Sequence, residues 1–136
     1  MVVTADTGEV LLLRRRDPPD FWQSVTGSLE WGETPLAAAR RELYEETGID
    51  AGERLLDLER SVRFPILPAW RERYAPDVDG NLEHWFHLPL PAPVAVRLNP
   101  GEHVEHRWLP VSGALRLVRS HTNREAIRFL STPPSG

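Results

Sequence analysis

Apolar residues between positions 36 and 47 recur at the spacing of one helix face. Leu36 and Leu43 lie on this face, and the rest of the segment is rich in Ala, Arg and Glu, which favour helices. Thr34 is a suitable N-cap, Pro35 suits the first helical position, and Gly48 stands where a helix commonly ends. The pattern therefore predicts a helix that runs from Pro35 to residue 47 and packs its leucine-bearing face against a sheet.

Shorter runs of alternating apolar and polar residues elsewhere in the chain predict strands. These runs cover residues 1–5, 10–13, 21–26, 55–64, 82–90 and 106–109. A helix is expected from Pro110 to residue 118, and Thr122 with Glu125 forms a capping box ahead of a last helix that reaches Leu130.

The composition is that of one soluble globular domain over residues 1–136. Hydrophobic residues make up 40% and charged residues 26% of the chain, and its 136 residues suffice for one core but not two. The absence of cysteine excludes a disulfide scaffold and a thiolate metal site. No apolar run is long enough to span a membrane and no secretion signal is visible, so no membrane partner and a cytoplasmic location are expected. The net charge of −4 argues against a nucleic-acid partner.

Three glutamates of the predicted helix crowd one side of it. At about 100° per residue, Glu42, Glu45 and Glu46 fall within a sector about 100° wide, beside the apolar face. Like charges at this spacing repel each other by a few tenths of a kcal/mol per pair. Because clusters of carboxylate oxygens suit Mg²⁺ or Mn²⁺, a bound cation would turn this repulsion into ligation.

A solvated acidic helix face is the ordinary interpretation of three glutamates alone, but their surroundings favour a metal site. Arg41 lies one turn before Glu45 and can hold its carboxylate in place. Glu33 precedes the helix, where it can accept hydrogen bonds from arginine or backbone donors. Gly27 allows the backbone to approach a metal ion or a phosphate closely.

The spacing of these residues resembles that of the Nudix hydrolases, with no departure from the family pattern. That resemblance implies an α/β/α sandwich around a mixed β-sheet, a divalent cation, and cleavage of a nucleoside diphosphate linked to another group. It also implies catalytic roles for Glu45, Glu46 and Arg41 and a structural role for Gly27, Glu33 and Gly48. The matched positions are Gly27, Glu33, Arg41, Glu42, Leu43, Glu45, Glu46, Gly48 and Ile49.

Segments outside this motif closely resemble one subfamily, the bacterial dihydroneopterin triphosphate pyrophosphohydrolases. They comprise residues 14–34, 60–66, 71–76, 81–86 and 120–127. The resemblance implies release of pyrophosphate from dihydroneopterin triphosphate, a step in folate synthesis, with a small-molecule triphosphate as the partner. It adds Glu102 to the metal ligands Glu42, Glu45 and Glu46, and its substrate-binding residues are Arg15, Thr26, Phe64, Pro65, Ile66, Leu67 and Ser120.

The chain departs from this subfamily in two places. The first predicted strand begins at Met1, whereas the relatives have an N-terminal extension that supplies a basic substrate contact, so a shortened N-terminus is expected. Pro65 and Leu67 also differ from the subfamily's pocket segment. Both departures bear on affinity and base selectivity more than on the chemistry.

Several alternatives follow from the sequence. Either a glutamate of the cluster or Glu102 accepts the proton from the attacking water, and the number of metal ions is open. Arg15 belongs to a run of three arginines that could be a solvated surface, and Glu102 by itself would be a surface carboxylate. The rival functions are a broad (d)NTP pyrophosphohydrolase for nucleotide clean-up and a non-catalytic Nudix-fold binding module. The oligomeric state, monomer or homodimer, is not determined by these patterns.

Overall fold

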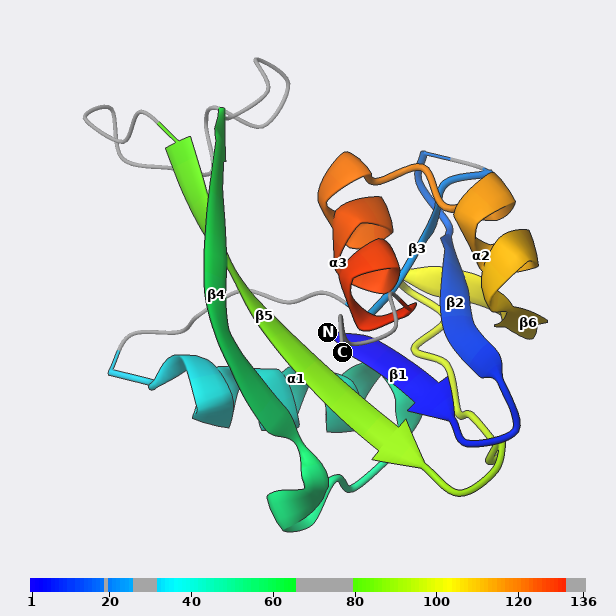
Figure 1. Ribbon diagram of the computed structural model, residues 1–136, viewed down its shortest axis with the longest axis horizontal. Coiled ribbons are helices and arrows are strands. Elements are labelled where there is room, and N and C mark those ends of the chain that lie inside the picture. Colours follow the sequence, from blue (N-terminus) through cyan, green and yellow to red (C-terminus); the bar gives the residue numbers. More distant parts are fainter. Residues whose placement is uncertain (19, 26–31, 66–79, 132–136) are drawn as a thin grey trace, which may run out of the picture.

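A mixed six-stranded sheet with helices on both faces forms the protein (Figure 1). The computed structural model describes residues 1–18, 20–25, 32–65 and 80–131. None of the helices in these ranges is long and apolar enough to span a membrane. The elements in chain order are β1 (Val2–Ala5), β2 (Glu9–Arg15), β3 (Trp22–Gln23), α1 (Pro35–Thr47), the 3₁₀ turn η1 (Gly52–Arg54), β4 (Leu56–Pro65), β5 (Gly80–Leu90), β6 (His103–Pro110), α2 (Val111–Leu117) and α3 (His121–Ser131).

The sheet combines parallel and antiparallel pairs. Its strands follow the order β3-β2-β1-β5-β4, and β6 also pairs with β2. β1 is antiparallel to β2, with Thr4 opposite Val10, and parallel to β5, with Val3 opposite Leu88. The other pairs, β2–β3, β2–β6 and β4–β5, are antiparallel. This mixed sheet confirms the predicted fold class.

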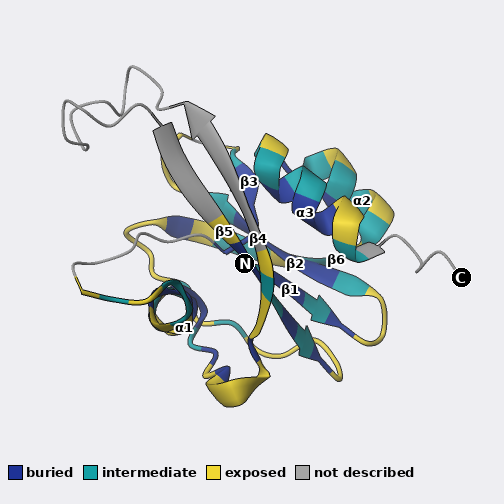
Figure 2. Ribbon diagram, turned by 60° about the vertical axis from the view of Figure 1, so that its left-hand side comes forward, coloured by how far each residue is buried: buried dark blue, intermediate teal, exposed yellow. Residues whose placement is uncertain are grey.

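Alternate residues of β2 point to two separate hydrophobic cores, one on each face of the sheet. Leu11 and Leu13 pack into the core shared with α1, whereas Val10 and Leu12 pack into the core shared with α2 and α3. All four side chains are buried, as expected for a strand covered on both faces. Figure 2 shows α1 on one side of the sheet and the α2–α3 pair on the other. The expected α/β/α sandwich is therefore confirmed.

Both ends of α1 follow the sequence signals. The Thr34 hydroxyl accepts a hydrogen bond from the Ala37 backbone N–H at 3.2 Å, and Pro35 occupies the first turn. Gly48 adopts a left-handed conformation with φ of 74°, and its N–H donates to the Tyr44 carbonyl oxygen at 2.8 Å. The α1 prediction is confirmed.

Several strands differ in length from their predictions, and for β3 and β6 the cause is a contact that is distant in sequence. β3 covers only Trp22–Gln23 of the expected 21–26 segment, since the next backbone N–H, that of Ser24, donates to the Asn123 side-chain oxygen at 3.0 Å. β6 is longer than the expected 106–109 segment, because it pairs with β2 from the Glu9–Pro110 position to the Arg15–His103 position.

The expected capping box of the last helix is wrong in its position. α3 begins at His121, and the Ser120 hydroxyl accepts a hydrogen bond from the Asn123 backbone N–H at 3.3 Å. Ser120 is therefore the N-cap, and Thr122 lies inside the first turn with its hydroxyl 3.1 Å from that of Ser120. The two candidate caps stand only two residues apart, and sequence spacing alone favoured the wrong one.

Candidate metal centre

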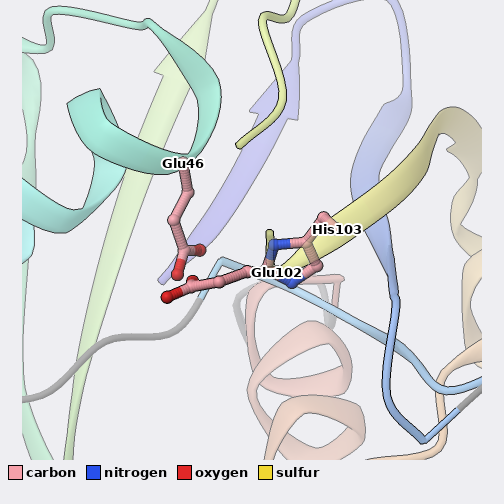
Figure 3. Close-up of side chains that lie close together, drawn as sticks. All are labelled: Glu46, Glu102 and His103. Carbon is pink, nitrogen blue, oxygen red and sulfur yellow. The ribbon is translucent and has the colours of Figure 1, made fainter. Parts of the chain in front are cut away.

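Two acidic side chains and a histidine meet where the end of α1 approaches the start of β6. Glu46 comes from the last turn of α1, Glu102 precedes β6, and His103 is the first residue of that strand. One ligand atom from each of the three lies within 4.8 Å of the other two. Figure 3 shows the two carboxylates side by side with the imidazole next to them.

A tight turn places Glu102 at this position. The Asn99 carbonyl oxygen accepts hydrogen bonds from the backbone N–H groups of Glu102 and His103, at 3.0 and 2.9 Å. The Arg16 N–H donates to the Glu102 carbonyl oxygen at 2.8 Å and so fastens the turn to the end of β2. Next to this bond, the β2–β6 register shifts between Arg14 and Arg15, an irregularity often found beside functional sites.

Glu46 is a buried carboxyl group whose charge is disfavoured. Only 4% of the residue is exposed, and this burial is the main reason that its pKa rises to about 9. A hydrogen bond with Glu102 and the negative charges of Glu102 and Glu42 raise the pKa further, while the N-terminal ammonium group lowers it. Within the described part of the chain, Glu46 Oε2 is also buried without a hydrogen-bond partner.

These features fit a divalent cation. The buried Oε2 lacks a hydrogen-bond partner among the described residues, and a cation beside it would supply the missing interaction. Two carboxylates provide the hard oxygen ligands that Mg²⁺ and Mn²⁺ prefer. A cation would also offset the repulsion that raises the pKa of Glu46.

Arg41 connects three glutamates on the outer side of the same helix. Its guanidinium group binds Glu33 through two hydrogen bonds, of 2.9 and 3.0 Å, in a bidentate pair. It also donates to Glu42 at 2.9 Å and to Glu45 at 3.2 Å. Arg41 thus fixes the segment before α1 to the helix and holds two of the motif carboxylates next to each other.

The three helix glutamates consequently occupy different environments. Glu46 belongs to the buried group with Glu102 and His103, whereas the Glu42 side chain is 15% exposed and lies close enough to raise the pKa of Glu46. The Glu45 side chain is 51% exposed and pairs with Arg41. The structure therefore brings Glu46 and Glu102 together directly and leaves Glu45 at the exposed edge of the cluster.

His103 is a member of the site that the sequence motif did not identify. It is 2% exposed, and its Nε2 lies 3.2 Å from the side-chain nitrogen of Gln23. Burial lowers its pKa, the positive charge of Arg15 lowers it further, and Glu102 acts in the opposite direction. The only available sequence signal was the position of His103 beside Glu102.

The expected substrate-binding residues are only partly described. Arg15 ends β2 opposite His103, and its Nε donates to the Asp17 carbonyl oxygen at 2.9 Å. Ser120 caps α3 as described above. The backbones of Phe64 and Pro65 belong to β4. Thr26, Ile66 and Leu67, together with the motif residue Gly27, lie outside the described residues.

A cavity of about 230 Å³ between the start of the sheet and α2–α3 shares no residue with the acidic group. Its polar lining includes Thr4 and His87, whose Oγ1 and Nε2 atoms are 2.8 Å apart and satisfy each other. Burial lowers the pKa of His87, which favours the neutral ring. Thr4 and the neutral His87 satisfy each other and offer no charge to a phosphate. This cavity is therefore a weaker candidate for phosphate chemistry than the acidic group.

Comparisons with known proteins agree with the geometry. The family model described as the NUDIX domain matches residues 1–130. The dihydroneopterin triphosphate diphosphatase of Escherichia coli is 46% identical over 130 residues, which cover 93% of this chain and 85% of that protein. The enzyme of the same name from Haemophilus influenzae is 40% identical over 131 residues, covering 94% and 82%. The solved structure of the E. coli dihydroneopterin triphosphate pyrophosphohydrolase superimposes with a TM-score of 0.85 at 47% identity, over 94% of this chain and 89% of that one. The chain belongs to the NUDIX domain family.

Proposed function

We propose that this protein hydrolyses dihydroneopterin triphosphate to dihydroneopterin monophosphate and pyrophosphate in the cytoplasm, as a step of folate synthesis. The observation that carries the chemistry is the close approach of Glu46 and Glu102, in which burial and the neighbouring carboxylates raise the pKa of Glu46 to about 9. The substrate is supported by the relatives that share 40–46% of their aligned residues with this chain and carry that substrate in their names.

The cation of this reaction is Mg²⁺, with Mn²⁺ as a substitute, and its ligands are Glu46 and Glu102 together with Glu42 and Glu45. A divalent cation in such a site supplies positive charge that neutralises the phosphates and makes a neighbouring water more acidic. Glu46 and Glu102 support this assignment because their oxygens already lie together. Glu42 and Glu45 come from the same helix side, and Arg41 holds them at 2.9 and 3.2 Å.

The proton of the attacking water passes to a carboxylate of the cluster. Glu102 and Glu45 are the two exposed candidates, and exposure leaves each able to exchange that proton with solvent. Arg41 contributes by positioning, because its donors are occupied by Glu33, Glu42 and Glu45.

The triphosphate enters beside Arg15, which binds a phosphate oxygen. Arg15 supports this role because it stands opposite His103 in the β2–β6 pair, one residue from Glu102. The residue is partly exposed, and an arginine side chain keeps its positive charge at any working pH. Thr26, the 64–67 segment and Ser120 form the remainder of the proposed substrate site.

A pyrophosphate-release assay tests this function. Purified protein is given dihydroneopterin triphosphate, dATP or dGTP, each with and without Mg²⁺, and the products are identified by mass. We expect pyrophosphate and the pterin monophosphate as products, full dependence on Mg²⁺, and a kcat/KM for the pterin at least tenfold above that for either nucleotide. Equal rates for all substrates would replace the proposal with nucleotide clean-up, and no hydrolysis of any triphosphate would favour a binding module.

A further inference from the structure

His103 lies between a neutral amide and two carboxyl groups. On one side, its Nε2 is 3.2 Å from the Gln23 side-chain nitrogen, and both residues are buried. On the other side, the carboxyl oxygens of Glu46 and Glu102 lie within 4.8 Å of a ring nitrogen. Figure 3 shows the ring next to both carboxyl groups. Among the described residues, the second ring nitrogen, Nδ1, is buried and has no hydrogen-bond partner.

The contact with Gln23 determines which ring nitrogen carries the proton. An amide nitrogen can only donate, so the Nε2 atom that faces it must accept through its lone pair. A neutral imidazole that accepts at Nε2 carries its proton on Nδ1. The unpaired Nδ1 is therefore an N–H donor, and acceptor oxygens of Glu46 and Glu102 lie within 4.8 Å of a nitrogen of the same ring.

The character of the neighbours favours a donor over a metal ligand. Mg²⁺ prefers oxygen ligands, and an imidazole nitrogen is a better ligand for zinc, copper or iron. Glu46 Oε2 is a buried acceptor without a partner, so the group contains one unused donor and one unused acceptor. Glu102 is exposed, and one of its carboxyl oxygens lies within 4.8 Å of a ring nitrogen of His103.

We propose that His103 is a positioning residue that donates its Nδ1–H to the Glu46–Glu102 carboxylate pair, and that Gln23 fixes the tautomer that makes this possible. The inference rests on the cation site of the proposed function. A donor at this point orients the carboxylates and leaves their remaining lone pairs for the cation. Residues that orient metal ligands in this way typically change metal affinity or activity by about 10–100-fold.

The tautomer can be read directly from the folded protein by ¹⁵N–¹H NMR of histidine-labelled samples. We expect the His103 ring to show a protonated Nδ1 and an unprotonated Nε2, both before and after addition of Mg²⁺. The opposite tautomer would overturn the proposal, as would loss of the Nδ1 proton when Mg²⁺ is added, since a ligating nitrogen cannot keep it. Neither outcome depends on the substrate, so a failure here is distinguishable from a failure of the proposed function.

Variants of His103 test the consequence for the carboxylates. His103→Asn keeps an amide donor near the position of Nδ1, whereas His103→Ala removes the donor. Mn²⁺ binding, followed by water-proton relaxation, should weaken about 10–100-fold in His103→Ala and stay within about threefold of the parent in His103→Asn. Equal affinity in the parent and the alanine variant would contradict the proposal.

Gln23 provides a second test that leaves the imidazole in place. Gln23→Met keeps the side-chain length and removes the donor to Nε2, and Gln23→Glu puts an acceptor there. We expect the NMR pattern to lose its single tautomer in the methionine variant and to show a proton on Nε2 in the glutamate variant. An unchanged tautomer in both folded variants would show that Gln23 does not set it.

Discussion

At the scale of single residues, the burial of the three motif glutamates follows their angular distance from the apolar face of α1. At about 100° per residue, Glu46 lies about 20° from Ala39, Glu42 about 60° and Glu45 about 120°. Correspondingly, Glu46 is buried, the Glu42 side chain is 15% exposed and the Glu45 side chain is 51% exposed. The helical period alone thus separates one buried carboxyl group from one that remains in solvent.

The burial of Glu46 has a cost that depends on pH. Its pKa is about 9 in the folded protein, against 4.5 for an unperturbed group, so folding binds a proton between these two values. In the metal-free protein, the contribution of this carboxyl group to the free energy of unfolding is fully present below pH 4.5. It is lost as the pH rises toward 9.

Glu46→Gln should remove this dependence, because the amide keeps the size of the side chain and has no charge. We expect metal-free Glu46→Gln to melt roughly 5–10 °C above the parent at pH 8 and within about 2 °C of it at pH 5. Glu45→Gln is the matched control, since Glu45 is exposed, and its difference from the parent should not grow with pH. A constant difference for Glu46→Gln across this range, measured by calorimetry with a chelator present, would contradict the assigned burial.

Glu102→Ala should affect turnover and hardly affect stability. The residue is exposed, and the hydrogen bonds that form its turn are made by backbone groups, so they survive the loss of the side chain. We expect kcat to fall by one to three orders of magnitude, which corresponds to about 1.4–4 kcal/mol in the activation barrier. The melting temperature without metal should change by less than about 2 °C. A variant with the parent's rate and Mg²⁺ dependence would return Glu102 to the role of a surface carboxylate.

The sequence groups the α1 carboxylates on one side of the helix because all of them lie within about one helical turn, and their role as metal ligands stays a prediction. The pairing of Gln23 with His103 was not accessible in this way. These two residues are 80 positions apart, and they meet only because β3 and β6 both pair with β2. No local pattern distinguishes such a buried histidine from an ordinary one.

At the scale of elements, the end of α1 depends on a glycine in the left-handed conformation. Gly48 has φ of 74°, and a Cβ atom there would lie 3.3 Å from Cβ of Arg97. Gly48→Ala should therefore destabilise the protein by about 1–2 kcal/mol, or roughly 3–8 °C in melting temperature.

Gly113→Ala is the matched control for this substitution. Gly113 lies within α2, where an added Cβ would meet Leu109 at an ordinary contact distance of 3.7 Å. Because alanine favours helices, this variant should be as stable as the parent or more stable. Equal destabilisation by the two substitutions, measured by thermal unfolding, would show that the backbone conformation of Gly48 is not the cause.

Helices and strands differed in how well the sequence defined them. α1 carries its own cap, its own end signal and a full apolar stripe, so its bounds follow from local residues. The length of β3 depends instead on Asn123, which takes the next backbone N–H of the segment, and that of β6 depends on β2. Tertiary partners determine where these strands end, and sequence periodicity does not contain that information.

At the scale of the whole molecule, the site forms where two distant parts of the chain are brought to one end of the sheet. α1 packs on one face, and the turn that contains Glu102 is fixed to the end of β2 by the Arg16–Glu102 backbone bond. The motif of α1 predicted the chemistry, but Glu102 came only from a family resemblance, because no pattern near residue 102 indicates a metal ligand. The proposed role of residues 64–67 in selecting the base likewise rests on resemblance.

Arg15→Ala tests whether Arg15 binds the phosphates of the substrate. Arg15 is next to the acidic group, so we expect its loss to lower kcat/KM for every triphosphate substrate alike. The expected loss is roughly 10–150-fold, or about 1.5–3 kcal/mol. Arg16→Ala is the control, because Arg16 is exposed and meets Glu102 only through its backbone. An Arg15→Ala variant that loses activity toward one base and keeps it toward another would place Arg15 at the base and not at the phosphates.

The central claim is that the group around Glu46 holds the cation on which hydrolysis depends, and metal binding and turnover measured on the same samples test it most directly. Mn²⁺ affinity from water-proton relaxation and pyrophosphate release from dihydroneopterin triphosphate are compared for the parent and Glu46→Gln. We expect Glu46→Gln to bind Mn²⁺ at least tenfold more weakly and to lose at least 100-fold in kcat, about 2.7 kcal/mol. A folded Glu46→Gln protein that binds Mn²⁺ like the parent and turns over within threefold of it, about 0.7 kcal/mol, would contradict the claim.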